Sequence, residues 1–254
     1  METMWHVEDR PMKSTSQTTP CGALSHGDVH VLHGSLAGEV YQLREWYATL
    51  SHDERQRAGQ FHFDLHRDRF IAARGILRML LGRYLDTLPN SIVFNYGLKG
   101  KPSLPSDPLH FNVSHSEGRA LFAFSATTAL GVDLEAVRPL PDVLQIARSA
   151  FSTSERKALE ALAPELQHQA FFRCWTRKEA FIKALGDGLS FPLDRFSVSL
   201  DEPARIIHVD GELAAPSQWT LQHLALHDGF VGAIATRQQH PRVLLSHWKE
   251  IVAL

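Results

Sequence analysis

The stretch RALFAFSATTALGVDLE, residues 119–135, indicates how the whole chain is organised. Both ends of it have a strand-like composition, at 119–126 and at 130–135, and the two threonines between them favour a turn. Helical patterns followed by strand patterns occur before this stretch and again after it. We therefore predict an α+β fold with a pseudo-twofold duplication of two similar α+β halves, and we place the seam within 125–131.

The chain divides into three predicted parts: an N-terminal extension at 1–27, rich in Ser, Thr, His, Gly and Pro, a first half at 28–127 and a second half at 128–254. In the first half the patterns predict a strand at 28–36, helices at 41–50, 53–63 and 67–85, and strands at 91–96, 109–113 and 119–126. In the second half they predict a strand at 130–135, helices after Pro141, after Ser152 and at 169–186, and strands at 195–200, 204–209, 219–226 and 231–236.

Composition restricts the classes of protein to which the chain can belong. Its 254 residues are 44% hydrophobic and 21% charged, as in ordinary folded proteins. The 26 basic and 28 acidic residues nearly cancel, so no overall charge would attract the chain to nucleic acid or to an anionic membrane. No apolar run approaches the roughly 18 residues of a membrane span, and Cys21 and Cys174 fit no metal-ligand spacing. We expect a soluble, cytoplasmic protein with free thiols and no nucleic-acid or membrane partner.

The segment GVDLE at 131–135 carries two acidic residues in a predicted strand. Alternate side chains of a strand share a face, so Asp133 and Glu135 point the same way with Cβ atoms about 7 Å apart. Two carboxylates at this spacing can converge on one hard cation, and Gly131 allows another backbone or a ligand to come close. A strand with one solvated face would show the same alternation, so the segment alone leaves both interpretations open.

The segment WTRKEAFIK at 175–183 belongs to a predicted helix with a broad apolar arc. Lys178 and Glu179 fall inside this arc, and Lys183 lies at its edge. Lysine and glutamate are rarely placed on a buried face unless they are paired or liganded. These residues therefore indicate either a ligand site or a buried internal ion pair.

Three carboxylates, those of Asp133, Glu135 and Glu179, suit magnesium, which takes oxygen ligands and is often shared with substrate phosphates. Zinc does not fit, because no cysteine or histidine cluster accompanies them. In FSTSE at 151–155, Ser152 and Glu155 have the spacing of a capping box at a helix start. A direct catalytic role for Glu155 is the alternative.

A phosphate ligand also needs positive charge beyond the metal. Arginines are dense in the first half, at positions 55, 57, 67, 69, 74, 78 and 83. Arginine forks match phosphate geometry, although a solvated helix face would be equally basic. Lys101 lies in a tight loop, and Ser114 and His115 follow a predicted strand with side chains able to bond a phosphate.

In order and in spacing, these segments resemble the 4′-phosphopantetheinyl transferase superfamily, and in particular its long single-chain branch, the type that activates surfactin synthetase. The motifs that carry the resemblance are GVDLE at 131–135, FSTSE at 151–155 and WTRKEAFIK at 175–183, with support from KGKPSLP at 99–105, FNVSHS at 111–116 and GLSFPLDRFSV at 188–198.

The resemblance implies two α+β halves with coenzyme A bound between them. It implies an enzyme that uses magnesium to move the phosphopantetheine arm of coenzyme A onto a serine of an apo-carrier protein, an acyl or peptidyl carrier domain. Adenosine 3′,5′-bisphosphate would be released. A monomer is expected, because the duplicated halves could supply the whole cleft.

The resemblance also implies residue roles. The expected magnesium ligands are Asp133, Glu135 and Glu179. The expected coenzyme A contacts are Arg57, Arg69, Lys101, Ser114, His115, Lys178 and Lys183. The expected catalytic residues are Glu179 as the base for the serine proton, Lys183 at the pyrophosphate leaving group, and Glu155 as the reserve base. Glu54 stands where some relatives have a basic residue, so the site for the 3′-phosphate is expected to differ there.

Two other functional classes are compatible with part of this pattern. A magnesium-dependent nucleotide phosphohydrolase would share the carboxylates and the basic residues, but its characteristic glutamate box is absent from the sequence. A noncatalytic coenzyme A-binding module would be expected to lack the metal carboxylates, and all three are present. The transferase is the main prediction.

Overall fold

The computed structural model describes residues 24–97, 100–106, 108–186, 192–211 and 215–252. Its helices are α1 (Val40–Thr49), α2 (His52–Gly59), α3 (Asp64–Leu85), α4 (Val143–Ala150), α5 (Thr153–Glu160), α6 (Pro164–Leu185) and α7 (Trp248–Val252), with short 3-10 turns at Pro89–Ser91, Leu193–Arg195 and Pro216–Gln218. Its strands are β1 (Asp28–Ser35), β2 (Asn95–Tyr96), β3 (Pro102–Ser103), β4 (His110–Ser116), β5 (Arg119–Ser125), β6 (Leu130–Ala136), β7 (Phe196–Val198), β8 (Ile206–Val209), β9 (Thr220–Leu224), β10 (Phe230–Thr236) and β11 (Arg242–His247). Across these ranges, no helix has both the length and the apolar character needed to cross a membrane.

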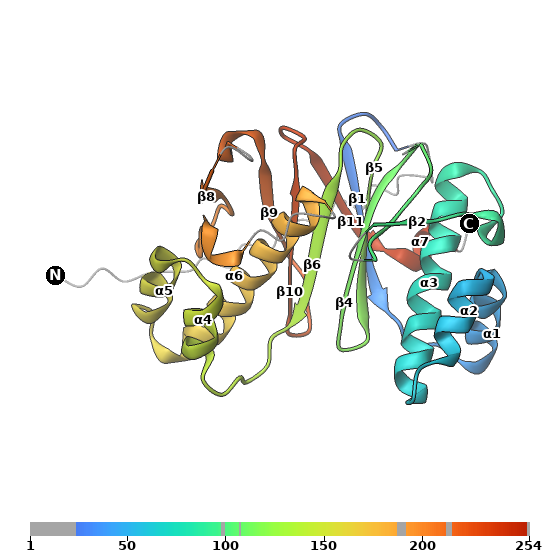
Figure 1. Cartoon of the computed structure of the whole chain (residues 1–254), viewed down its shortest axis with the longest axis horizontal. Coiled ribbons are helices and arrows are strands. Elements are labelled where there is room, and N and C mark those ends of the chain that lie inside the picture. Colours follow the sequence, from blue (N-terminus) through green and yellow to red (C-terminus); the bar gives the residue numbers. More distant parts are fainter. Residues whose placement is uncertain (1–23, 98–99, 107, 187–191, 212–214, 253–254) are drawn as a thin grey trace.

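Two sheets lie side by side at the centre of the molecule, and helices cover their outer faces (Figure 1). The first sheet has the strand order β11-β1-β5-β4 and the second β6-β10-β9, and two further strand pairs, β2-β3 and β7-β8, lie apart from them. The strands pair antiparallel throughout, except that β1 and β11 are parallel. Helices α1, α2 and α3 lie outside the first sheet, and α4, α5 and α6 lie outside the second. The predicted α+β class is confirmed.

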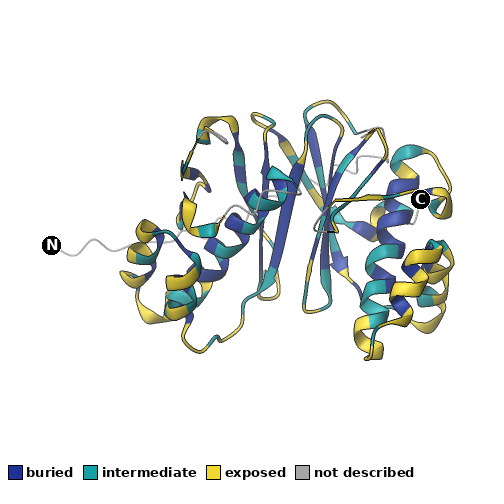
Figure 2. Cartoon of the chain, viewed as in Figure 1, coloured by how far each residue is buried: buried dark blue, intermediate teal, exposed yellow. Residues whose placement is uncertain are grey.

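The apolar side chains form three layers of core. One layer packs α3 against the first sheet, and another packs α6 against the second. The third fills the space between the sheets, with Val29, Val31 and Leu121 from the first sheet against Val132 and Ile234 from the second. Figure 2 shows the result, in which the central strands and the inward sides of α3 and α6 are buried. Each sheet is thus covered on both faces.

Most predicted elements are present, and local chemistry explains the differences in their limits. Helix α6 begins five residues earlier than position 169, because Pro164 supplies a favoured first helical residue. Helix α2 ends at Gly59, a residue of low helix propensity, before position 63 is reached. The strand predicted at 91–96 is reduced to two residues, because the preceding segment forms a 3-10 turn that starts at Pro89.

The C-terminal segment corrects the predicted division into halves. The boundary at 127/128 falls in the connection between β5, which belongs to the first sheet, and β6, which belongs to the second. However, β11 returns to pair with β1, and Trp248 packs edge-to-face on Trp46 of α1, with ring centroids 6.1 Å apart. Residues 242–252 therefore belong structurally to the first half, and neither this strand nor α7 was predicted. Residues 1–23 of the predicted extension, with Cys21, lie outside the described residues, whereas Cys174 is a buried free thiol.

Candidate active site at the seam between the sheets

Helix α6 lies directly against strand β6 because position 131 has no side chain. A Cβ atom on Gly131 would stand 2.2 Å from the carbonyl oxygen of Ala180 and 2.3 Å from the amide nitrogen of Ala184. Since side chains alternate along a strand, Asp133 and Glu135 share this α6-facing side. Their carboxylates face the helix at the edge of the second sheet, and Asp133 is only 5% exposed.

Asp133 is held by groups from both halves of the molecule. Its Oδ1 accepts a hydrogen bond from Lys183 Nζ of α6 at 2.7 Å and another from Ser114 Oγ of β4 at 2.9 Å. Its Oδ2 is buried without a hydrogen-bond partner. Burial raises the pKa of this carboxyl group, and the nearby Lys183 ammonium opposes the rise. A buried carboxylate oxygen without a partner is costly, and a hard cation would satisfy it.

Glu135 lies one step further along the same face and is half-buried. Its Oε2 accepts a hydrogen bond from Ser116 Oγ at 2.9 Å. Burial raises the pKa of the Glu135 carboxyl group, and the Ser116 hydrogen bond acts in the opposite direction because it favours the ionised form. Ser114 and Ser116 of β4 thus each donate one hydrogen bond to a carboxylate of β6.

Glu179 lies on α6 one helical turn before Lys183 and is half-buried. Residues four apart share a helix face, so Glu179 is on the same side of α6 as the lysine that contacts Asp133. Among the described residues, no three acidic, histidine or cysteine side chains are grouped closely enough to hold a metal ion. The ligand set of Asp133, Glu135 and Glu179 therefore stays a prediction. The chemistry of its oxygen donors and the unpaired Oδ2 of Asp133 fit magnesium.

Lys178 and Glu155 are engaged elsewhere, which corrects two of the sequence-based roles. Lys178 Nζ donates to both carboxylate oxygens of Glu155, at 2.8 and 2.7 Å, and to the carbonyl oxygen of Phe196 at 2.6 Å. Lys178 is fully buried in the core of the second half, at 0% exposure, so its ammonium group is out of reach of coenzyme A. The alternative of a buried ion pair holds for Lys178, while Glu179, the next residue, shares a face of α6 with Lys183.

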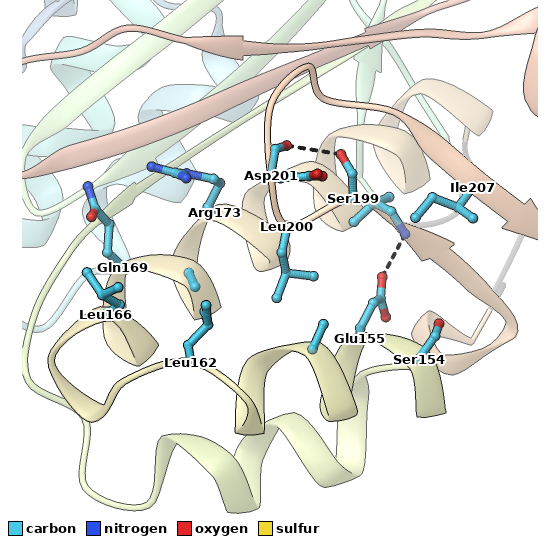
Figure 3. A pocket seen from close by; sticks show the side chains of 13 residues that line it. Ser154, Glu155, Leu162, Leu166, Gln169, Arg173, Ser199, Leu200, Asp201 and Ile207 are labelled. Carbon is cyan, nitrogen blue, oxygen red and sulfur yellow. Dashed lines mark hydrogen bonds between the residues drawn. The ribbon is translucent and has the colours of Figure 1, made fainter. Parts of the chain in front are cut away.

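Glu155 has a structural role on the far side of the second half. It forms the capping box of α5 with Ser152, and its Oε1 accepts a hydrogen bond from the amide of Val198 at 2.8 Å. Figure 3 shows this carboxylate in the wall of a cavity of about 600 Å³, with Leu162, Leu200 and Ile207 around it. No other predicted site residue lines this cavity. The capping-box interpretation is correct, and the role of reserve base has no geometric support.

Three arginines of the first half, Arg57, Arg69 and Arg74, line a larger cavity, of about 950 Å³, between α2, α3 and β4. Arg57, Arg69 and His115 lie in its wall, as does Ser116. Burial lowers the pKa of His115, and the charges of Lys183 and Arg69 lower it further. His115 is therefore close enough to interact electrostatically with Arg69 in the cavity wall and with Lys183 at the seam. Ser116 borders the cavity and also bonds Glu135, so the Glu135 carboxylate lies next to the cavity wall.

Lys101 connects the two halves beside Lys183. Its Nζ donates to the carbonyl oxygen of Lys183 at 2.7 Å, which joins the β2–β3 segment to the last turn of α6. The sequence assigned Lys101 and Ser114 to the ligand. In the structure both residues contact the Lys183 region, so they lie at the site and also hold its two walls together.

The structure also places two residues in the cavity wall to which the sequence assigned no ligand contact. Arg74 lies in the wall of the cavity, within 6.0 Å of the ring centroids of Phe70, Phe94 and Tyr96. Glu54 also borders the cavity, but its Oε2 accepts a hydrogen bond from the buried Arg78 at 2.7 Å. The arginine spacing and Phe70 lie on α3 and were visible in the sequence, whereas Phe94 and Tyr96 come from a later segment.

The fold and the site define a class of protein. This is an α+β molecule of two halves with a basic cavity beside the buried Asp133 and the half-buried Glu135, an arrangement suited to a ligand with several phosphate groups and a divalent cation.

Comparison with known proteins agrees with this class. The sequence profile of the 4′-phosphopantetheinyl transferase superfamily matches residues 129–235. The 4′-phosphopantetheinyl transferase HetI of Nostoc sp. is 40% identical over 214 residues, which are 82% of this chain and 87% of that protein. The 4′-phosphopantetheinyl transferase Sfp of Bacillus subtilis is 33% identical over 158 residues, 62% of this chain and 69% of that protein. The chain belongs to the 4′-phosphopantetheinyl transferase superfamily.

Among solved structures, the holo-[acyl-carrier-protein] synthase of Thermotoga maritima is similar at 21% identity with a TM-score of 0.34. That similarity covers 43% of this chain and 62% of the other, and it is too weak to define the fold.

Proposed function

We propose that this protein transfers the 4′-phosphopantetheine arm of coenzyme A onto a serine of an apo-carrier protein. In this reaction the serine oxygen forms a bond to the phosphorus that bears pantetheine, while the bond from that phosphorus to the pyrophosphate bridging oxygen breaks. Adenosine 3′,5′-bisphosphate leaves, and a base accepts the serine proton.

The observation that supports this proposal is that Ser116 lines the basic cavity and also bonds Glu135, so that the cavity adjoins the carboxylates at the seam. Coenzyme A carries a 3′-phosphate and a pyrophosphate, and it needs basic contacts for both. Arg57, Arg69 and His115 are suited to the 3′-phosphate, because they line one cavity. Lys183 is suited to the pyrophosphate, because its ammonium lies between Ser114 and Asp133 at the seam.

We infer that Asp133, Glu135 and Glu179 hold magnesium beside the pyrophosphate. When bound, the ion would neutralise the negative charge that builds on the departing phosphate. Asp133 is suited to this task, because its Oδ2 is buried and unpaired while its Oδ1 is fixed by Lys183 and Ser114. Glu179, one turn from Lys183, is proposed as the base that takes the serine proton.

The first prediction concerns the metal carboxylates. Asp133→Asn and Glu179→Gln keep the shape of each side chain and remove its charge. Each should reduce transfer at least about 100-fold, because charge stabilisation by a metal is worth several kcal/mol and about 1.4 kcal/mol is tenfold in rate. The measurement incubates each variant with coenzyme A, magnesium and an apo-carrier and reads the mass of the carrier over time.

Asp210→Asn is the matched control, because Asp210 is a surface residue paired with Arg195 and His208. Its transfer rate should equal that of the unchanged protein. Near-normal transfer by Asp133→Asn would show that the metal centre is assigned wrongly. Release of phosphopantetheine into solution with no mass gain on any carrier would favour the hydrolase.

A further inference from the structure

The two sheets meet along β4 and β6, the edge strands of their respective sheets, without a backbone ladder between them. Edge strands expose unpaired backbone groups that need partners. Here the side chains of β4 provide them. Asn112 Oδ1 accepts from Val132 N at 2.9 Å, Ser114 Oγ from Leu134 N at 3.2 Å, and Ser116 Oγ from Ala136 N at 3.3 Å. We call these three contacts the side-chain ladder.

The three rungs of the ladder repeat every second residue on both strands, because alternate side chains share a face. They differ in what lies on the α6-facing side of β6. Beside the Asn112 rung the residue is Gly131, which has no side chain. Beside the Ser114 and Ser116 rungs the residues are Asp133 and Glu135, and each serine hydroxyl donates to the neighbouring carboxylate at 2.9 Å.

A serine hydroxyl is suited to this double task because it can donate one hydrogen bond while it accepts others. Ser116 Oγ is thus fixed by the Ala136 amide, and its proton points to Glu135 Oε2. Asp133 has a second fixed donor in Lys183, whereas Ser116 is the side chain that the described residues show bonded to Glu135. The orientation of the Glu135 carboxylate therefore depends on Ser116.

We propose that Ser116 is a positioning residue, which holds the Glu135 carboxylate in the orientation that receives magnesium. This inference rests on the proposed function, in which Glu135 is a metal ligand. Residues that orient metal ligands through hydrogen bonds typically change metal affinity by about 10- to 100-fold when they are replaced. Ser116 would act through Glu135 and would not itself take part in the transfer.

The test compares Ser116→Ala with Asn112→Ala. Both variants remove one rung of the ladder between the sheets, but only Ser116→Ala removes a donor to a carboxylate. The protein, with coenzyme A present, is titrated with Mn²⁺, and free Mn²⁺ is followed by electron paramagnetic resonance. Ser116→Ala should raise the dissociation constant for Mn²⁺ about tenfold, and Asn112→Ala should leave it within about twofold. The magnesium concentration that half-saturates carrier modification should shift in parallel.

Ser116→Thr restores the hydroxyl and should return Mn²⁺ binding toward that of the unchanged protein. If Ser116→Ala does not fold, Ser116→Cys keeps the volume with a weaker donor, and its dissociation constant should lie between the two. Thermal unfolding midpoints of all variants separate a loss of stability from a loss of metal affinity.

An unchanged dissociation constant in Ser116→Ala, or an equal rise in Asn112→Ala, would overturn the inference while the transferase proposal stands. If the unchanged protein modifies carriers without binding Mn²⁺, the magnesium centre fails and this inference fails with it. If the unchanged protein binds Mn²⁺ but modifies no carrier, and Ser116→Ala raises the dissociation constant for Mn²⁺, only the proposed reaction is refuted.

Discussion

At the scale of single residues, Lys178 and Glu179 show how two adjacent charged side chains on one helix receive different tasks. Successive residues of a helix point about 100° apart, from its 3.6 residues per turn. Lys178 therefore turns into the core of the second half, where Glu155 and the Phe196 carbonyl bind it. Glu179 shares a face of α6 with Lys183, which contacts Asp133 of β6. The sequence showed that both were misplaced for a solvent-facing helix, but it could not separate them.

The Lys178–Glu155 pair yields a prediction about stability. Lys178→Met fills the same space and leaves the Glu155 carboxylate buried without its counter-charge. The free energy of unfolding should fall by about 3–5 kcal/mol, the usual cost of breaking a buried pair from one side. Chemical denaturation measures this change.

The double variant Lys178→Met with Glu155→Gln is the control for that prediction. The amide oxygen of glutamine can still accept one of the two backbone hydrogen bonds that Glu155 receives, from Val198 or from Ser152, and no charge stays buried. It should recover part of the lost stability. Equal stabilities for the single and double variants would show that the charge of Glu155 is already satisfied without Lys178.

At the scale of elements, the contact between α6 and β6 decides the geometry of the site. Small residues on both sides, Gly131 on the strand with Ala180 and Ala184 on the helix, bring the two backbones together. In the first half, α3 instead packs on its sheet through large side chains such as Tyr84 and Phe124, whose ring centroids are 4.7 Å apart. Each half packs a long helix on its sheet. In the second half the close contact between α6 and β6 lets Lys183 reach Asp133.

Gly131→Ala tests the importance of this close contact. The new methyl group would overlap backbone atoms of α6 at 2.2 and 2.3 Å, and these atoms cannot move as a flexible side chain can. We expect a loss of about 1–3 kcal/mol or more in the free energy of unfolding, together with a loss of transfer activity.

Gly59→Ala is the matched control, because nothing lies within 4 Å of the added Cβ at the end of α2. It should be neutral or slightly stabilising, by up to about 1 kcal/mol, since alanine favours a helix over glycine. Denaturation midpoints compare the stability of both variants. Equal midpoints would mean that α6 can move away from β6 with little loss of free energy of unfolding.

At the scale of the whole molecule, the last described elements return to the first half, because β11 pairs with β1 and α7 packs against α3 and β1. Trp248 of α7 is buried against Trp46, and its indole nitrogen has no hydrogen-bond partner. Strand β11 and helix α7 thus complete the core of the first half.

Trp248→Ala should therefore destabilise the protein by about 3–5 kcal/mol, the usual cost of an aromatic side chain removed from a core. Trp248→Phe should cost far less, because it keeps most of the ring volume and the lost nitrogen bonds nothing. Thermal unfolding followed by tryptophan and far-ultraviolet signals measures both variants. A small effect of Trp248→Ala would mean that α7 is not part of the cooperative fold.

The sequence by itself determined most of what depends on neighbouring residues. Period-two and helical patterns located the principal strands and helices. The Ser152–Glu155 spacing specified a helix cap, and the order of the motifs identified the superfamily. It also indicated that the charges on the apolar arc of α6 must be paired or liganded. These features are local, because backbone geometry fixes which side chains share a face.

Only the tertiary structure decided the pairings between distant segments. Lys178 pairs with Glu155, and Lys183 pairs with Asp133. Strand β11 pairs with β1 in the first sheet, and the serines of β4 bond β6 of the second sheet. A pattern along the chain tells which face a residue occupies but not which element will cover that face. That choice is made when two surfaces pack and each buried polar group must find a partner.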